Sequence, residues 1–316
     1  MSRFNNGLIY TNDSCIACNK CVTNCSTFGA NVSLVENGKL TIQIDSEKCN
    51  NCGKCIDLCI RNARQYRDDF DLFQKDLARG EKISVILSPV FHLYYGEKLN
   101  NFIGFLKSIG VQKVYDETFG AEINIWAHTN YLKEHIAEES RAFISQTCPS
   151  LVNTIELHYP NLLHRIVPVH SPMMCTAIYA KKYLCDANKI AYIGTCVSKK
   201  DEINNPLTFG FVNYNVTFKK FCEHYDLQNM EKNNSNFDLN CFGFGKITNF
   251  SGGLSEIIES CFPPNYQTVK MIGFVPTNFQ TLKLESENKK FLSSLINELS
   301  FFEDLTLFPY SLHHLF

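Results

Sequence analysis

The 316-residue sequence has no apolar run close to the roughly 18 residues that a membrane-spanning helix requires. Its N-terminus, MSRFNNGLIY, lacks the apolar core of a secretory signal, and the chain contains no polybasic block. An excess of one charge is also missing, since 30 basic and 32 acidic residues leave a formal net charge of -2. These absences argue against membrane insertion and against nucleic acid as the main partner. We expect a soluble, cytoplasmic protein.

Cysteine, by contrast, is abundant. The chain has 15 cysteines, and eight of them lie within the first 59 residues. In a secreted chain this density would indicate disulfides, whereas in an intracellular chain it indicates metal binding.

Two cysteine motifs with identical spacing lie 34 residues apart, CIACNKCVTNC at 15–25 and CNNCGKCIDLC at 49–59. Both follow C-x2-C-x2-C-x3-C, in which three thiolates bind one iron–sulfur cube and the fourth points to the other. A zinc ribbon would need two pairs of cysteines rather than two quartets. The motifs therefore predict two [4Fe-4S] clusters. The predicted ligands are Cys15, Cys18, Cys21 and Cys59 for cluster 1, and Cys49, Cys52, Cys55 and Cys25 for cluster 2.

The segment between the motifs, SLVENGKLTIQID, predicts a β-hairpin that turns at Asn37-Gly38. With this hairpin, residues 10–70 resemble the bacterial dicluster ferredoxin family.

Beyond residue 69, short apolar runs alternate with segments of helical spacing. The predicted strands are 82–90, 111–117, 141–148, 189–196 and 268–276. The predicted helices are 97–109, 121–136, 171–184 and 287–302, with two more that open at Pro149 and Ser251. This alternation indicates βαβ units and a mostly parallel sheet. The Asn-rich stretch at 229–240 is predicted to be an exposed loop.

The fold class that follows is an α+β ferredoxin-like dicluster domain at residues 1–78 and an α/β domain at residues 79–316. We expect the α/β domain to form two lobes, roughly 79–200 and 201–316.

Two predicted strands end in a cysteine with turn residues behind it. Cys148 is followed by Pro149, and Cys196 is followed by Val197-Ser198-Lys199. Ligands of open α/β sheets bind at the carboxyl ends of the strands, so both thiols would face one crevice. A helix N-terminus there would lower the thiol pKa and favour an anionic cluster. The alternative is that these are two unrelated core cysteines.

The order of these motifs resembles the [FeFe]-hydrogenase large-subunit family over nearly the whole chain. SQTCPSLVN (145–153) stands where that family has T-S-C-C-P, and IGTCVSKKDE (193–202) where it has M-P-C-x-x-K-x-x-E. NFSGGLSEII (249–258) is similar to the family's F-x-x-T-G-G-V-x-E-A helix start.

The family's H-cluster joins a [4Fe-4S] cube through a shared cysteine to a diiron unit that carries CO and cyanide. The resemblance implies that Cys148 and Cys196 are ligands of this cube. It also implies that Lys199 contacts a cyanide and that Glu202 belongs to a proton path. The relay cysteine of the family is Thr147 here, and a hydroxyl passes protons less readily than a thiol at neutral pH.

The family's third motif, F-M-A-C-P-G-G-C, has no counterpart in LTLFPYSLHHLF (305–316). Three interpretations follow: the chain is a fragment, the family site has decayed, or other residues substitute. The possible substitutes are Cys175, which is the best placed, Cys241, Cys261, His313 and His314. We expect Cys185 and Cys222 to be core residues.

Three functions remain open. The first is an iron–sulfur electron-transfer or redox-sensing protein whose two clusters relay electrons to a site between the lobes, without a complete H-cluster. The second is an active iron hydrogenase, and the third is a non-catalytic iron–sulfur cluster assembly factor. The expected partner is a redox protein such as ferredoxin or an oxidoreductase subunit.

Overall fold

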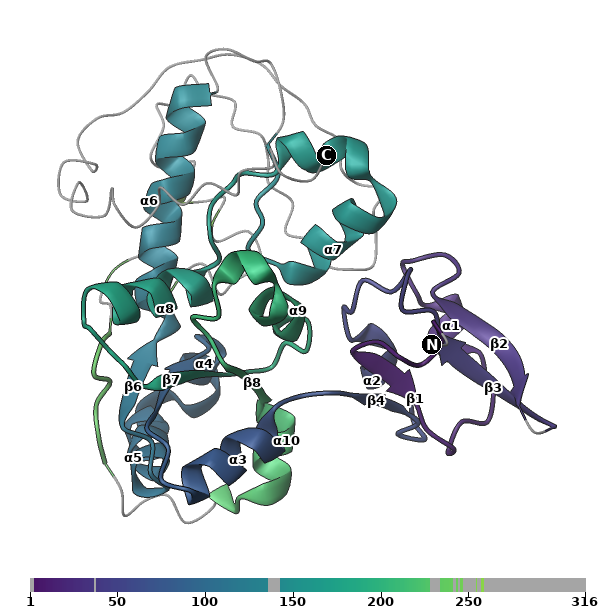
Figure 1. The fold of residues 1–316 in the computed structure, drawn as a ribbon, viewed down its shortest axis with the longest axis horizontal. Helices are drawn as coiled ribbons and strands as arrows, with labels where there is room; N and C mark the ends of the chain where they lie inside the picture. The colour runs from purple at the N-terminus through teal and green to yellow at the C-terminus, as the bar shows by residue number, and fades with distance from the viewer. Residues whose placement is uncertain are drawn as a thin grey trace.

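A computed structural model describes residues 3–36, 38–135, 143–227, 234–240, 243, 245–246, 254 and 257–258. It contains a small N-terminal unit beside a larger α/β body (Figure 1). Within this part of the chain, no helix has the length and apolar character needed to cross a membrane.

The N-terminal unit consists of two antiparallel strand pairs and two short helices. Its elements are β1 (Ile9–Thr11), α1 (Lys20–Thr23), β2 (Asn31–Glu36), β3 (Lys39–Ile44), α2 (Lys54–Asp57) and β4 (Arg64–Tyr66). β1 pairs with β4, and β2 pairs with β3. Glu36 lies opposite Lys39, and Gly38 between them has a φ of +76°, as a tight two-residue hairpin turn requires. The described part of the predicted hairpin is therefore confirmed.

The body is built on a four-stranded parallel sheet in the order β6-β5-β7-β8. Its strands are β5 (Ile83–Leu87), β6 (Lys113–Asp116), β7 (Lys189–Gly194) and β8 (Tyr214–Thr217). Its helices are α3 (Phe70–Ala78), α4 (Val90–Tyr95), η1 (Gly96–Lys98), α5 (Leu99–Ser108), α6 (Glu117–His135), α7 (Pro149–His158), η2 (Pro160–Arg165), α8 (Pro172–Lys182), α9 (Lys199–Asn204), η3 (Pro206–Thr208) and α10 (Phe218–His224). The predicted parallel α/β architecture is confirmed.

Helices cover both faces of the sheet, which is why the inner strand β5 is buried along its whole length and apolar apart from Ser84. Val85 and Leu87 point to one face, where they pack with Phe73 of α3 and with α5 and α10. Ile86 points to the other face and packs with Met174 of α8. Figure 1 shows α3, α5 and α10 together on one side of the sheet and α6 and α8 on the other.

Two predicted elements differ in the structure. The segment 141–148 was predicted as a strand, but its described residues make only one isolated bridge, between Ile144 and Ile166. The predicted exposed loop at 229–240 is also wrong in part, because Leu239 bridges to Tyr115 at the edge of β6. The backbone N–H of Asp116 donates to the Leu239 carbonyl at 2.9 Å, so this segment extends the sheet edge.

The expected internal boundaries also shift. β8 pairs with β7 in one sheet, so a lobe boundary at residue 200 would divide that sheet. α3 packs into the core of the body through Phe70 and Phe73, and the ferredoxin-like unit therefore ends before α3 rather than at residue 78. The predicted elements at 251–253, 268–276 and 287–302 lie outside the described residues, apart from isolated positions.

Gly120 marks the closest approach of α6 to α8. A Cβ at this position would lie 2.0 Å from the Pro172 carbonyl oxygen and 2.2 Å from Thr176 Oγ1. Neither backbone can move without disturbing the sheet face that α8 covers. We expect Gly120→Ala to lower the free energy of unfolding by about 2 kcal/mol through overpacking. Chemical denaturation measures this change, with Asn130→Ala on the same helix as the control, and an unchanged midpoint would contradict the packing described.

Candidate functional site

Three of the four predicted cluster 1 cysteines meet in one apolar cluster. Cys15, Cys21 and Cys59 pack with Ile42 and Ala63, while Cys18 is exposed. Their sulfurs accept hydrogen bonds from the fold itself. The donors are Ile42 N–H to Cys15 Sγ at 3.4 Å, Arg64 Nη2 to Cys21 Sγ at 2.9 Å and Ala63 N–H to Cys59 Sγ at 3.2 Å. Such donors stabilise thiolate charge.

Cys59 illustrates the balance at this site. Partial burial raises its pKa, but the backbone N–H groups of Arg64, Ala63 and Arg61 outweigh burial and hold the pKa below its usual value. These N–H groups thus ease the loss of the Cys59 thiol proton that ligation requires.

The predicted cluster 2 cysteines form a second group. The thiols of Cys49 and Cys55 each interact electrostatically with those of Cys25 and Cys52, so the fourth cysteine of the first motif joins the first three of the second motif. Burial raises the pKa of Cys49 and of Cys55 to about 12, so these thiols are neutral without metal and release protons when metal binds. Among the described residues, no three His, Cys, Asp or Glu side chains are close enough to hold a single metal ion. In a [4Fe-4S] cube each thiolate bonds a different iron, so the cysteine sulfurs lie farther apart than the ligands of a single metal ion.

The cluster 2 loop is fastened to the body by amide side chains. Asn50 Nδ2 donates to Thr154 Oγ1 of α7 at 2.9 Å. Asn51 Nδ2 and Asn153 Nδ2 both donate to Asp201 Oδ2 of α9, each at 2.8 Å. In Figure 1, α7 and α9 accordingly lie on the side of the body that faces the N-terminal unit.

Cys148 and Cys196 lie on the body side of this interface. Cys148 is the N-cap of α7, and its thiol interacts electrostatically with Cys196 and Lys199. Cys52 of the cluster 2 loop in turn interacts with Cys148. The structure therefore brings the two predicted body cysteines together and places Cys148 near Cys52 of the second cysteine motif. The expected lowering of thiol pKa is wrong for Cys148, because burial outweighs the N–H groups of the helix start and raises its pKa.

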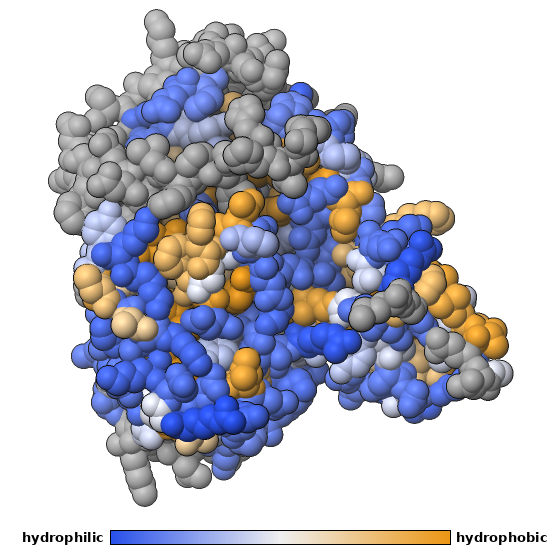
Figure 2. All heavy atoms as spheres, viewed as in Figure 1, coloured by the Kyte–Doolittle hydropathy of each residue, from blue (hydrophilic) through white to orange (hydrophobic). Residues whose placement is uncertain are grey.

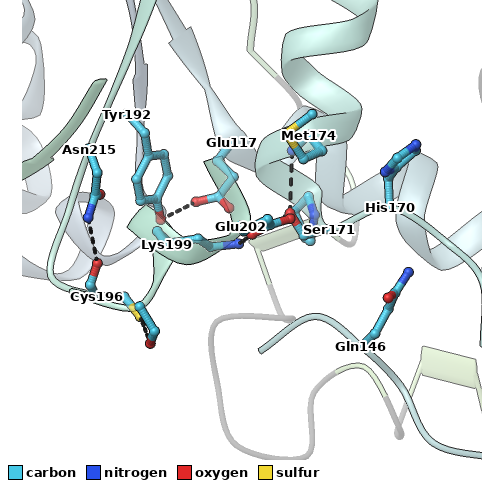
Figure 3. Close-up of polar contacts among 12 residues, drawn as sticks. Glu117, Gln146, His170, Ser171, Met174, Tyr192, Cys196, Lys199, Glu202 and Asn215 are labelled. Carbon is cyan, nitrogen blue, oxygen red and sulfur yellow. Dashed lines mark hydrogen bonds and ion pairs between the residues drawn. The ribbon is translucent and has the colours of Figure 1, made fainter. Parts of the chain in front are cut away.

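Lys199 lies in a buried polar network at the carboxyl end of the sheet (Figure 3). Its Nζ donates to Glu202 Oε2 at 2.7 Å and to Ser171 Oγ at 3.2 Å. Burial alone would lower the pKa of Lys199, but the carboxylates of Glu202 and Glu117 outweigh burial and hold it above its ordinary value. The ammonium is therefore charged and already bound by internal partners.

Glu117 and Tyr192 complete the network. Tyr192 OH donates to Glu117 Oε2 at 2.9 Å, and Lys199 Nζ lies 6.0 Å from the centre of the Tyr192 ring. Tyr192 reaches this position because residue 194 is glycine, where a Cβ would lie 2.7 Å from the tyrosine ring. Neither Glu117 nor Tyr192 was predicted from the sequence as a site residue. For Glu117, the sequence feature that could have indicated a site is its position as an acid at the end of the predicted strand 111–117.

Of the other described candidates, Cys175 and Thr147 lie near the site, whereas Cys185 and Cys222 lie at the surface. Cys175 is buried with Ile123 and Ile178, and its thiol donates to the His170 carbonyl at 3.5 Å. Thr147 is half-buried beside Cys148. Cys185 and Cys222 are exposed, so the expectation that they are core residues is wrong. The candidates Cys241, Cys261, His313 and His314 lie outside the described residues.

Two protein-family models match this chain. The family model for the iron only hydrogenase large subunit, C-terminal domain, matches residues 81–293. The chain belongs to the iron-only hydrogenase large-subunit family. A model for a 4Fe-4S dicluster domain matches residues 14–63. This family member is thus an iron–sulfur protein with a ferredoxin-like dicluster unit and a hydrogenase-like body.

Individual relatives agree with this assignment. Iron hydrogenase 1 of Clostridium pasteurianum is 27% identical over 223 residues, which cover 61% of this chain and 38% of that protein. The chain therefore spans well under half the length of that relative. A solved [FeFe]-hydrogenase from work on oxygen inactivation matches 62% of this chain and 59% of its own, with a TM-score of 0.53 and 17% identity. A variant of an [FeFe]-hydrogenase from Chlamydomonas reinhardtii has a TM-score of 0.51, at 17% identity over 62% of this chain and 58% of its own. These structures share the fold.

Asp201 offers a test of the interface. Its carboxylate acts electrostatically on Cys49, and it lies between Asn51 and Asn153. Asp201→Asn keeps an acceptor oxygen for one of these amides but removes the negative charge. We expect the midpoint potential of cluster 2 to rise by tens of millivolts at low ionic strength, with cluster 1 unchanged. A redox titration followed by electron paramagnetic resonance measures this, with the exposed Asp71→Asn as control. Equal shifts of both clusters would contradict the assignment.

Proposed function

We propose that this chain is an iron–sulfur electron-transfer or redox-sensing protein. In this proposal, two [4Fe-4S] clusters relay electrons to a redox site on Cys148 and Cys196, and no complete H-cluster forms. The observation that carries the proposal is the position of the Cys148 thiol, which interacts with Cys52 on one side and with Cys196 on the other. An electron that reaches the cluster 2 loop therefore has the body cysteines next to it.

The cluster ligands are part of the proposal. Bound iron–sulfur clusters would supply one-electron storage, and the chain supplies eight cysteines in two groups for them. We assign Cys15, Cys18, Cys21 and Cys59 to cluster 1, and Cys49, Cys52, Cys55 and Cys25 to cluster 2. The shared apolar surroundings of three cluster 1 thiols and the electrostatic grouping of the four cluster 2 thiols support this assignment.

The state of Lys199 supports an incomplete H-cluster. The family's lysine at this position contacts a cyanide of the diiron unit, and for that its ammonium must be available. Here the ammonium donates to Glu202 and Ser171 and lies near Glu117. The positive charge is therefore balanced within the chain. Thr147 in the relay position adds a second argument, because its hydroxyl is a poor proton carrier at neutral pH.

Hydrogenase activity is the second candidate function. The observation that favours it is the match of residues 81–293 to the hydrogenase large-subunit family model. In that case Glu202 would pass protons to the site.

We further propose that electrons enter at cluster 1 from a one-electron carrier such as ferredoxin or an oxidoreductase subunit. Cys18 is exposed, and the apolar neighbours of two other cluster 1 cysteines, Ile16 and Ile60, are 54% and 72% exposed. Figure 2 displays apolar patches over the N-terminal unit at the right of the view. An exposed apolar surface beside a cluster suits the short-lived contact that electron transfer needs.

The two candidates differ in infrared absorption. The full chain, produced anaerobically with the maturation proteins of an [FeFe]-hydrogenase, should bind iron and sulfide but give no bands from iron-bound CO or cyanide. A relative hydrogenase matured in parallel is the positive control. Such bands in this chain would overturn the proposal in favour of hydrogenase activity.

A further inference from the structure

We propose that Glu117 takes up a proton when the redox site on Cys148 and Cys196 accepts an electron. The inference rests on the proposed function, because it requires a redox site at these cysteines. It goes further by assigning a task to a carboxylate that neither the cysteine motifs nor the family match singles out.

Glu117 occupies the end of the sheet where such coupling is possible. It follows β6 directly and begins α6, and only 5% of its surface is exposed. Its carboxylate accepts a hydrogen bond from Tyr192 OH. The titratable and charged groups that act on Glu117 itself are Asp116 from β6, Tyr192 from β7, Lys199 and Glu202 from α9, and Cys175 from α8.

Charge in this network is unevenly shared. Two carboxylates, Glu117 and Glu202, face a single ammonium, and Lys199 makes its 2.7 Å ion pair with Glu202. Glu117 is left with a neutral donor, the Tyr192 hydroxyl. Burial raises the pKa of Glu117 to about 7, while Lys199 and Tyr192 restrain the rise. The carboxylate is therefore poised to gain or lose a proton near neutral pH.

The network is electrostatically linked to the redox site. Cys196 acts on both Tyr192 and Lys199, the two residues that set the charge around Glu117. An electron added at Cys148 and Cys196 brings negative charge, which favours protonation of a nearby buried carboxylate. The electron comes from the ferredoxin-like unit, which an external one-electron donor reduces, and the proton comes from water. An O–H bond forms on Glu117, so the region gains one electron and one proton and its net charge is unchanged.

A route for the proton is present on the other side of Lys199. A cavity of about 40 Å³ is bordered by Ser171, His170 and Glu202, beside Gln146 (Figure 3). This exceeds the roughly 10–15 Å³ that one water requires. In this proposal the Lys199 ammonium gives a proton to the nearby Glu117 and is reprotonated by Glu202, its ion-pair partner, which takes the proton from water in the cavity. The arrangement connects a buried acceptor to water without exposing the redox site.

The test is an anaerobic redox titration of the full, iron-replete chain at several pH values, followed by electron paramagnetic resonance. In the wild-type chain we expect the midpoint potential of the Cys148/Cys196 site to fall by about 59 mV for each tenfold fall in proton concentration near neutral pH. Below the pKa of Glu117 in the oxidised chain, and above its pKa in the reduced chain, the potential should level off.

Two variants identify the group. Glu117→Gln should abolish the pH dependence. Tyr192→Phe should retain it but move it to higher pH, because the Tyr192 hydroxyl holds the pKa of Glu117 down. Cluster 1 is the internal control and should show no such dependence in any variant. If Glu117→Gln fails to fold, redox-difference infrared spectra of the wild-type chain decide instead, since reduction should create the band of a protonated carboxyl group.

The titration distinguishes a failure of the Glu117 inference from a failure of the proposed function. A titratable site at Cys148 and Cys196 with a pH-independent potential, or with a dependence that survives Glu117→Gln, would overturn this inference and leave the proposed function standing. The absence of any redox site at these cysteines would overturn both.

Discussion

Replacing both Cys148 and Cys196 with serine should remove the third [4Fe-4S] cube that the family resemblance implies for the redox site, and so lower the iron content from about twelve to about eight atoms per chain. The two thiols interact with each other, and that of Cys148 also interacts with Cys52, whereas the eight ferredoxin-like cysteines all lie in the N-terminal unit. Removing both thiolates should therefore abolish one four-iron centre and spare the other two. Iron and sulfide analysis of anaerobically reconstituted protein gives the count.

Two controls sharpen this experiment. Cys185→Ser removes an exposed thiol and should leave iron unchanged. Cys175→Ser removes the thiol that packs with Ile123 and Ile178, and it too should leave iron unchanged if Cys175 is a core residue. Loss of iron in the Cys175 variant would make that thiol a ligand. Unchanged iron in the Cys148 and Cys196 variant would return both cysteines to the core.

Lys199→Met should lower the free energy of unfolding by about 3–5 kcal/mol, as is typical when one partner of a buried ion pair is removed. Lys199 is 5% exposed, and it is the cation shared by Glu202 and Glu117. Both carboxylates would remain buried without a compensating charge. Chemical denaturation measures the loss, with the exposed Lys219→Met on α10 as control.

The loss of stability in Lys199→Met should grow as the pH rises. Burial raises the folded-state pKa of Glu117 to about 7, so its folded form binds more protons than the unfolded form between its ordinary value and about pH 7. Its contribution to stability therefore falls as pH rises through that window. Without Lys199 the pKa would rise further, and the loss should be larger at about pH 8 than at about pH 5. The double variant Lys199→Met/Glu202→Gln should recover part of the stability, and an additive loss would contradict the shared ion pair.

The ferredoxin-like unit was predictable because its cluster ligands are cysteines at short, regular spacing in the sequence. Cysteines with two or three residues between them are typical of a cube-binding loop, and Asn37-Gly38 between two alternating segments predicts a hairpin. The parallel sheet was predictable for a similar reason, since apolar strands such as 83–87 alternate with helices. Local patterns were less reliable at 141–148, where an apolar alternation formed a single bridge at Ile144 instead of a strand.

The Lys199 network was not predictable in the same way. Glu117 follows β6 and Tyr192 lies on β7, and these strands are separated by β5 in the sheet. In the sequence, Tyr192 is one residue of an apolar strand, and nothing local indicates that its hydroxyl reaches a carboxylate 75 positions away. The amide contacts of Asn50 and Asn51 with α7 and α9 likewise depend on how the two units meet. Only the fold brings these polar groups together.

In the proposed function, electrons pass from the two ferredoxin-like clusters to a redox site on Cys148 and Cys196. The most direct test of this transfer is a reductive titration of the full chain that counts electrons taken up and follows each centre by electron paramagnetic resonance. We predict uptake of about three electrons per chain, and about two in the Cys148→Ser/Cys196→Ser variant. Uptake of about two electrons by the wild-type chain, or no difference between the two proteins, would contradict this account.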